Sequence, residues 1–123
     1  MIALGRTAGK GRGVFAQKEF AAGETIERSP VLVVPDREWT MIEPTVLYGY
    51  TFSWGENLEH AALAMGLGSF YNHSWSANAE YLRRPEDEII EFVALRAISA
   101  GEEITVNYNG QGDESPLWFT VLP

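Results

Sequence analysis

The sequence predicts a mainly β domain with one short helix, and three observations support this. Short segments rich in Val, Ile, Phe and Tyr alternate with turns that contain Gly, Pro or Asn. Residues 22–26 (AGETI) and 100–104 (AGEEI) repeat one pattern, in which Gly permits a positive φ before a strand whose Ile points into the core. One segment, residues 56–65, has the composition of a helix, with acids near its start and Gly66 as its stop.

The other elements follow in chain order. The glycine-rich turn GKGRG (residues 9–13) leads into a strand over residues 14–16. A Val-rich segment over residues 22–35 is expected to be interrupted by Pro30 and ended by Pro35. Residues 46–55 (VLYGYTFSWG) alternate as one or two further strands.

The last third of the chain is also predicted to be β. RPEDE (residues 84–88) is a turn, and EIIEFVALRAI (residues 88–98) is either a strand pair or one long strand. A final strand, GEEITVNY (residues 101–108), begins at its Gly.

Composition sets the class of protein. A chain of 123 residues with 46% apolar and 12% aromatic residues suits one globular domain. The absence of Cys excludes disulfides and cysteine zinc clusters, and two His argue against a multi-histidine metal site, so we expect no metal. No apolar stretch is long enough to span a bilayer, and the N-terminal residues have no secretory h-region. We therefore expect no membrane partner, and a cytoplasmic location, or a nuclear one in a host with a nucleus.

The charge is strongly acidic and unevenly distributed. Seventeen acids against nine bases give a net charge of −8, which disfavours direct nucleic-acid binding. Residues 1–18 carry four bases and no acid, whereas residues 85–123 carry eight acids against Arg96 alone. Such a field attracts a cationic protein or peptide. A solvated acidic surface that aids solubility explains the same charges.

The segment FYNHSWSANAEY (residues 70–81) carries the strongest chemical signal. It places Asn72, His73 and Asn78 among aromatic rings, where amide and imidazole groups are costly unless they are hydrogen bonded. The segment is therefore more typical of a site wall than of a surface turn. The glycines at 11 and 13 permit close approach of the backbone to a ligand, although an ordinary flexible turn explains them as well.

Three segments in this order resemble the SET-domain protein lysine methyltransferases. They are GRGVF (residues 11–15), NHSWSAN (residues 72–78) and GEEITVNY (residues 101–108), against the family's GxG, NHSCxPN and GEExTxDY. The resemblance extends from about Gly11 to Tyr108. ALAMGLGSFYNHS (residues 62–74) further resembles the small, stand-alone members of bacterial or viral type.

The resemblance implies a fold and a set of site residues. The fold is a β-clip of several small sheets with a threaded, pseudoknot-like C-terminal segment. Residues 1–123 would be a single SET domain, with core motifs at 11–108 and a short post-SET-like segment at 109–123. S-adenosyl-L-methionine would be the cofactor and Tyr108 the catalytic tyrosine, with Tyr81 in the lysine channel. The cofactor-binding residues implied are Gly11, Arg12, Gly13, Asn72, His73 and Trp118; Trp118 would be an aromatic lid over the adenine, or else core packing.

The activity implied is methyl transfer to a lysine amine of a basic protein or peptide, whether histone-like, ribosomal or other. The lysine must first lose its proton, and an aromatic channel beside a sulfonium lowers the amine's pKa by desolvation and like-charge repulsion. The brevity of the chain and the apolar segment VLVVP (residues 31–35) raise the prospect of a homodimer, although that segment suits the core equally.

Three positions depart from the family motifs. Trp75 replaces Cys, Ala77 replaces Pro, and Asn107 replaces the Asp before the tyrosine. Because the sequence has no Cys, we expect no pre-SET or post-SET zinc module, and part of the peptide groove would then have to come from a second copy of the chain. These departures keep a catalytically inactive β-clip module that binds basic peptides as an alternative, and a β-clip protein that binds a small molecule unrelated to lysine as a third hypothesis.

Overall fold

Two small β-sheets form the domain in the computed structural model, which describes residues 1–110, 112–115 and 117. The four-stranded sheet has the order β1-β2-β9-β6, with β1 Ile2–Arg6, β2 Arg12–Ala16, β9 Glu103–Val106 and β6 Asn72–His73. The five-stranded sheet has the order β4-β5-β3-β8-β7, with β4 Thr51–Trp54, β5 His60–Ala64, β3 Thr25–Val34, β8 Ile89–Ala94 and β7 Ala79–Arg84. The prediction of a mainly β chain with several small sheets is confirmed.

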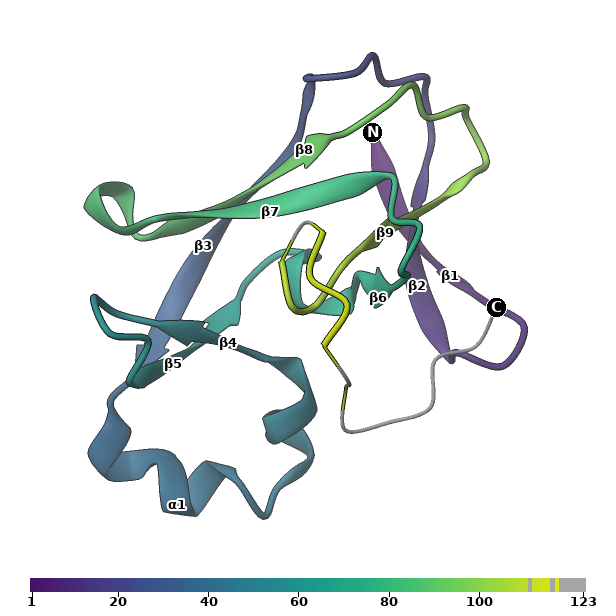
Figure 1. The fold of residues 1–123 in the computed structure, drawn as a ribbon. Coiled ribbons are helices and arrows are strands. Elements are labelled where there is room, and N and C mark those ends of the chain that lie inside the picture. Colours follow the sequence, from purple (N-terminus) through teal and green to yellow (C-terminus); the bar gives the residue numbers. More distant parts are fainter. Residues whose placement is uncertain (111, 116, 118–123) are drawn as a thin grey trace.

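The helical elements are short and peripheral. The α-helix α1 spans Trp39–Ile42, and four 3₁₀ turns are η1 Asp36–Glu38, η2 Val46–Tyr50, η3 Gly68–Phe70 and η4 Pro85–Asp87. In Figure 1, α1 lies in a long excursion between β3 and β4, away from the four-stranded sheet. Within the described residues, no helix is both long and apolar enough to cross a membrane.

The helix predicted for residues 56–65 is wrong. Gly55 and Leu58 both have positive φ, so the chain turns sharply there and then enters β5. Strand β5 pairs with β4 on one side and with β3 on the other. Two ladders of backbone hydrogen bonds, together with the burial of Ala61, Ala62 and Ala64, outweigh the helix propensity of an Ala-rich segment.

Pro30 does not interrupt its segment, because β3 runs unbroken through it. Residues 25–30 of β3 pair with β8, and residues 31–34 pair with β5. Pro30 therefore lies where the strand exchanges one neighbour for the other, a place where its missing N–H costs little. Pro35 follows the end of the strand, as predicted. Val31 and Val33 pack against the core, whereas Leu32 between them is 58% exposed.

The other predicted strands are confirmed in part. Of residues 46–55, only the second half is a strand, β4, and the first half is the 3₁₀ turn η2. Of residues 88–98, residues 89–94 form the single strand β8. The two matched turns are confirmed, because Gly23 has a φ of 86° and Gly101 a φ of 90°. A strand follows each turn. Ile26 in the first strand is partly buried, and Ile104 in the second is fully buried.

The core lies between the sheets. Its fully buried members include Val14 and Ile104 from the four-stranded sheet and Ile90 and Phe92 from the five-stranded sheet. The segment after β9, yellow in Figure 1, runs between β6 and the β4–β5 hairpin. Most of the predicted threaded segment, residues 109–123, lies outside the described residues.

Candidate active site

Two cavities share Tyr108 as a lining residue. The first, which we call the tyrosine cavity, has a volume of about 430 Å³, and the second, the glycine-turn cavity, about 520 Å³. The tyrosine cavity is lined by residues that include Phe52, Tyr71, Tyr81, Arg83 and Tyr108. The glycine-turn cavity is lined by Lys10, Gly11, Arg12, Glu43, Thr45, Val46, Tyr48, Gly49, Tyr50, Ser69, Phe70, Asn72 and Tyr108. Five residues line both: Tyr48, Gly49, Tyr50, Ser69 and Tyr108.

Aromatic rings from the five-stranded sheet form one wall of the tyrosine cavity. Tyr81 of β7 meets Phe52 of β4 edge-on, with 5.1 Å between the ring centroids. The Tyr81 hydroxyl donates a 2.8 Å hydrogen bond to the Tyr108 carbonyl. Arg83 donates from Nε to the Ser53 carbonyl, and its guanidinium carbon lies 5.4 Å from the centre of the Tyr81 ring. Tyr81 is therefore held in place by its ring, its hydroxyl and a neighbouring cation.

Tyr108 is fixed at both ends. Its backbone N–H donates to Nδ1 of His73 at 3.0 Å, and its hydroxyl donates to the Tyr71 carbonyl at 2.7 Å. Burial, with smaller contributions from Glu103 and Tyr50, raises the pKa of the Tyr108 hydroxyl to about 12. The hydroxyl is consequently neutral near pH 7, and its hydrogen is committed to a carbonyl while its oxygen keeps its lone pairs.

His73 supports Tyr108 from behind the cavities. The imidazole is buried, and its Nδ1 accepts a hydrogen bond, so the neutral ring carries its hydrogen on Nε2. Burial first, and then the charge of Lys10, lower the pKa of His73 below its usual value. Trp75 packs against the ring edge-on at 4.3 Å. His73 is absent from the residues that line either cavity, so its visible role is to position the tyrosine.

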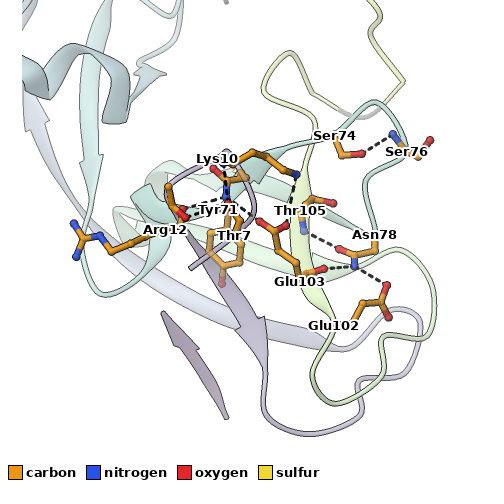
Figure 2. A network of polar contacts seen from close by, with 12 residues as sticks. Thr7, Lys10, Arg12, Tyr71, Ser74, Ser76, Asn78, Glu102, Glu103 and Thr105 are labelled. Atoms are coloured by element: carbon orange, nitrogen blue, oxygen red, sulfur yellow. Dashed lines mark hydrogen bonds and ion pairs between the residues drawn. The ribbon is translucent and has the colours of Figure 1, made fainter. Parts of the chain in front are cut away.

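Asn72 links the glycine turn to the last strand. Its Nδ2 donates to the Arg12 carbonyl at 3.1 Å and to Oε2 of Glu103 at 2.8 Å. A Cβ built on Gly13 would lie 2.5 Å from that Glu103 oxygen and 2.7 Å from Asn72 Nδ2, so a larger residue here would displace this pair from its present position. Figure 2 shows Lys10 and Glu103 joined across the same region.

The structure brings most of the predicted site residues together. Gly11, Arg12, Asn72 and Tyr108 line the glycine-turn cavity, and Tyr81 and Tyr108 line the tyrosine cavity. Gly13 and His73 lie behind these surfaces rather than on them. Trp118 lies outside the described residues.

Sequence reasoning missed several residues of the site. Tyr48 and Tyr50 line both cavities, and Phe70 contacts Tyr50 edge-on at 5.8 Å. The pattern Tyr48-Gly49-Tyr50 offered a signal, because two tyrosines beside a glycine are unusual in a peripheral turn. Glu103, in contrast, is indistinguishable by sequence from other strand acids.

Asn78 is a structural residue. It is 2% exposed, and its Oδ1 accepts from the Thr105 backbone N–H while its Nδ2 donates to the Glu103 carbonyl. These hydrogen bonds to β9 offset the free-energy cost of burying the amide. The replacement of the preceding proline by Ala77 has not prevented this arrangement.

Asn107 holds the turn after β9. Its Oδ1 accepts from the Asn109 backbone N–H, as an aspartate would, and its Nδ2 donates to the Asp113 carbonyl at 2.8 Å, which an aspartate could not do. Asn107 is buried and lines neither cavity. Its departure from the family motif therefore removes no group from the site.

Comparison with known protein families matches residues 11–109 to the SET domain. The chain belongs to the SET-domain lysine methyltransferase family. The matched range includes all three motifs, from Gly11 to Tyr108, and it confirms the resemblance that they indicated. Within the described residues, no group of His, Asp or Glu is arranged to hold a metal ion.

Individual relatives support the same assignment. The chain is 39% identical over 114 residues, 92% of its length and 73% of the relative's, to a Schizosaccharomyces pombe histone-lysine N-methyltransferase specific for H3 lysine-37. A 47-residue segment is 53% identical to the Gibberella zeae histone-lysine N-methyltransferase SET9, over 38% of this SET-domain chain and 7% of that protein. In structure, a humanized mutant of the Chaetomium thermophilum Polycomb Repressive Complex 2 bound to the inhibitor GSK126 aligns with a TM-score of 0.73 and 24% identity. That alignment covers 95% of this chain and 15% of that one, and it shows the shared fold.

Proposed function

We propose that this SET domain is an S-adenosylmethionine-dependent protein-lysine N-methyltransferase. One observation carries the proposal: the two cavities share the wall that contains Tyr50 and Tyr108. Methyl transfer requires a donor and an acceptor that approach one point from opposite sides. Two adjoining cavities that share Tyr108 in their lining can hold such a donor and acceptor.

The glycine-turn cavity fits the cofactor by its chemistry. Lys10 and Arg12 supply positive charge for a carboxylate, and Tyr50 and Phe70 supply ring surfaces for an adenosine. Asn72 Nδ2 is committed to Arg12 and Glu103, so its Oδ1 is the atom that can accept from a ligand amine. Gly13 and His73 act on this cavity indirectly, through Asn72 and Tyr108. Trp118, which lies outside the described residues, stays a candidate for an aromatic lid over the adenine, with core packing as the alternative. We further propose that residues 1–123 form a single SET domain.

The tyrosine cavity fits a lysine side chain. Phe52, Tyr71, Tyr81 and Tyr108 surround the space with ring carbon, which desolvates an ammonium and lowers its pKa. The Arg83 guanidinium in the same wall adds repulsion of the same sign. When bound, adenosylmethionine supplies the methyl group that the neutral amine takes up.

Tyr108 orients the reaction without exchanging a proton. With a pKa of about 12 its hydroxyl is a poor base near pH 7, so the lysine loses its proton to water before the transfer. The bond from the Tyr108 hydroxyl to the Tyr71 carbonyl fixes the oxygen, whose lone pairs can contact polarised hydrogens in the cavity. The chain's role is therefore positioning and desolvation.

A basic protein is the substrate class we propose, with histone tails as the first candidates. The net charge of −8 favours cationic partners, although Glu91, Glu102 and Glu103 are already paired with Arg84, Arg96 and Lys10. The fission yeast relative is named for a lysine of histone H3, which supports the same class. A histone substrate would place the protein in a nucleus, where the host has one, and another basic protein would allow the cytoplasm.

The test is label transfer from radioactive adenosylmethionine to histones and to a mixture of other basic proteins. We expect label on lysine, and in Tyr108→Phe a fall in kcat on the order of 10²-fold with cofactor affinity nearly unchanged, because only the hydroxyl is removed. Calorimetry with adenosylmethionine and a thermal melt establish that the variant is folded and loaded.

Two outcomes would contradict the proposal. Failure of the unaltered chain to bind adenosylmethionine removes the cofactor assignment. Binding of basic peptides with no label transfer supports the non-catalytic module instead.

A further inference from the structure

Glu103 occupies the centre of the polar contacts behind the glycine-turn cavity. It lies on β9, which pairs with β2 on one side and with β6 on the other. Its Oε2 accepts from Asn72 of β6, and its Oε1 lies 3.5 Å from Lys10 Nζ in the turn before β2. The Lys10 and Glu103 side chains are only 23% and 18% exposed, so this pair is better shielded than an ordinary surface ion pair. In Figure 2 the Lys10 side chain reaches Glu103, whereas the Arg12 side chain points away from both.

The contacts of Asn72 determine which way its amide faces. Two oxygens, the Arg12 carbonyl and the Glu103 carboxylate, lie within hydrogen-bond distance of the same side-chain atom, and two acceptors require that this atom be the nitrogen. Among the described residues no donor reaches Asn72 Oδ1. The amide therefore presents an acceptor, and never a donor, to the ligand.

Gly13 provides independent support for this arrangement. The carboxylate of Glu103 and the amide of Asn72 both lie where a Cβ at position 13 would be. The second glycine of the GRG turn thus leaves room for the side-chain pair that covers it. This space, the ion pair with Lys10 and the orientation of the Asn72 amide all involve the Glu103 carboxylate.

We propose that Glu103 is a positioning residue for cofactor binding, because it holds the Asn72 amide with its Oδ1 available as an acceptor for a ligand amine. The inference rests on the proposed function, since it assigns the glycine-turn cavity to adenosylmethionine. Glu103 lines neither cavity itself and acts through Asn72.

Two substitutions of equal length separate the hydrogen bond from the charge. Glu103→Gln keeps an oxygen that can accept from Asn72 Nδ2 and loses the charge that pairs with Lys10. Glu103→Met keeps the volume and loses both. We expect Glu103→Gln to stay within about threefold of the unaltered protein in KM for adenosylmethionine, and Glu103→Met to raise that KM about tenfold or more with kcat changed less than threefold.

A double-mutant cycle tests whether the effect passes through Asn72. In an Asn72→Ala background, Glu103→Met should raise the KM for adenosylmethionine by less than threefold, because its partner is already gone. Glu102→Gln is the matched control: the neighbouring acid pairs with Arg96, away from both cavities, and its KM for the cofactor should not change.

Each result decides the inference. A KM for Glu103→Met within twofold of the unaltered protein overturns it, and so do additive effects in the cycle. A loss of tenfold or more in Glu103→Gln also overturns it, because the charge and not the amide position would then be responsible. Should Glu103→Met fail to fold in a thermal melt, the Glu103→Gln result decides alone. Failure of the unaltered chain to bind adenosylmethionine is a separate outcome that removes the proposed function as well.

Discussion

The two sheets contribute to the site in different ways. The four-stranded sheet supplies polar side chains that bond to backbone or to one another, such as Asn72 and Glu103. The five-stranded sheet supplies rings: Phe52 lies edge-on to Tyr81 at 5.1 Å and to Phe92 at 6.4 Å. The four-stranded sheet therefore stabilises the site through hydrogen bonds, and the five-stranded sheet stabilises it through packing of aromatic rings.

This difference explains which half of the site a sequence can reveal. A directional bond to a backbone group demands one residue type at one position, so β2, β6 and β9 carry readable motifs. A packed ring can be exchanged for another ring, or reached from a different strand, with little loss. The aromatic wall therefore leaves a weaker pattern than the polar network does.

Substitutions in the two sheets should give opposite kinetic effects, and this is the largest contrast we expect. Asn72→Ala should weaken adenosylmethionine binding at least tenfold and leave the KM for a histone peptide within about threefold, because it removes an acceptor from the glycine-turn cavity. Phe52→Ala should raise the KM for the peptide about tenfold and change adenosylmethionine binding little, because Tyr81 loses the ring that packs against it. Steady-state kinetics with each substrate varied in turn measures both.

A common effect of both substitutions on both substrates would break the comparison. It would mean that a substitution in either sheet changes binding in both cavities, through the shared residues Tyr50 and Tyr108. Thermal melts of both variants are needed, since loss of the Phe52 ring costs packing, on the order of 2–3 kcal/mol for a half-buried Phe.

Asn107 offers a smaller test, on stability rather than kinetics. Asn107→Asp keeps the acceptor for the Asn109 N–H and loses the donor to the Asp113 carbonyl. We expect the free energy of unfolding in urea to fall by about 1–2 kcal/mol, because the Asp113 carbonyl loses its donor and a carboxylate is desolvated at the buried position 107.

Asn57→Asp is the control for this test, because the same chemical change is made at an exposed turn position and should be nearly neutral. Equal unfolding free energies for Asn107→Asp and the unaltered chain would show that the turn after β9 does not depend on the amide.

His73 should make stability depend modestly on pH. Its pKa is lowered in the folded state by burial, so the unfolded chain binds a proton first as pH falls through the usual value of 6.5. Protonation then favours the unfolded chain, and the free energy of unfolding should decline from about pH 6.5 downward and be constant with respect to His73 above it.

His73→Asn is the matched variant, because an Asn oxygen can accept from the Tyr108 N–H in place of Nδ1 but does not titrate. The slope of stability against pH below 6.5 should be smaller in this variant. An unchanged slope would assign the dependence to other groups.

Several features could be read from the chain before any coordinates. Strands β2, β3, β4, β8 and β9 followed from alternation and from turn residues, and the matched glycines at 23 and 101 are both at positive φ. Strands β1, β5, β6 and β7 were not predicted. The burial of His73 and Asn78 followed from their aromatic neighbours. The helix at residues 56–65 was wrong because local propensity favoured it while pairing on both sides favoured a strand. The strand break predicted at Pro30 was wrong because the sequence does not show that β3 changes its pairing partner at this residue.

Local chemistry accounts for the order of turns and strands, the positions of the motif residues and the family to which they belong. These features depend on short-range rules: where glycine is needed, where alternation buries a face, and which side chains carry chemistry. The meeting of two cavities at Tyr108, the place of Glu103 under Asn72 and the support that His73 gives the tyrosine depend on contacts between residues far apart in the chain. Such contacts arise only when both sheets are packed around one core, because a hydrogen bond or an ion pair acts over a few ångströms whatever the separation in sequence.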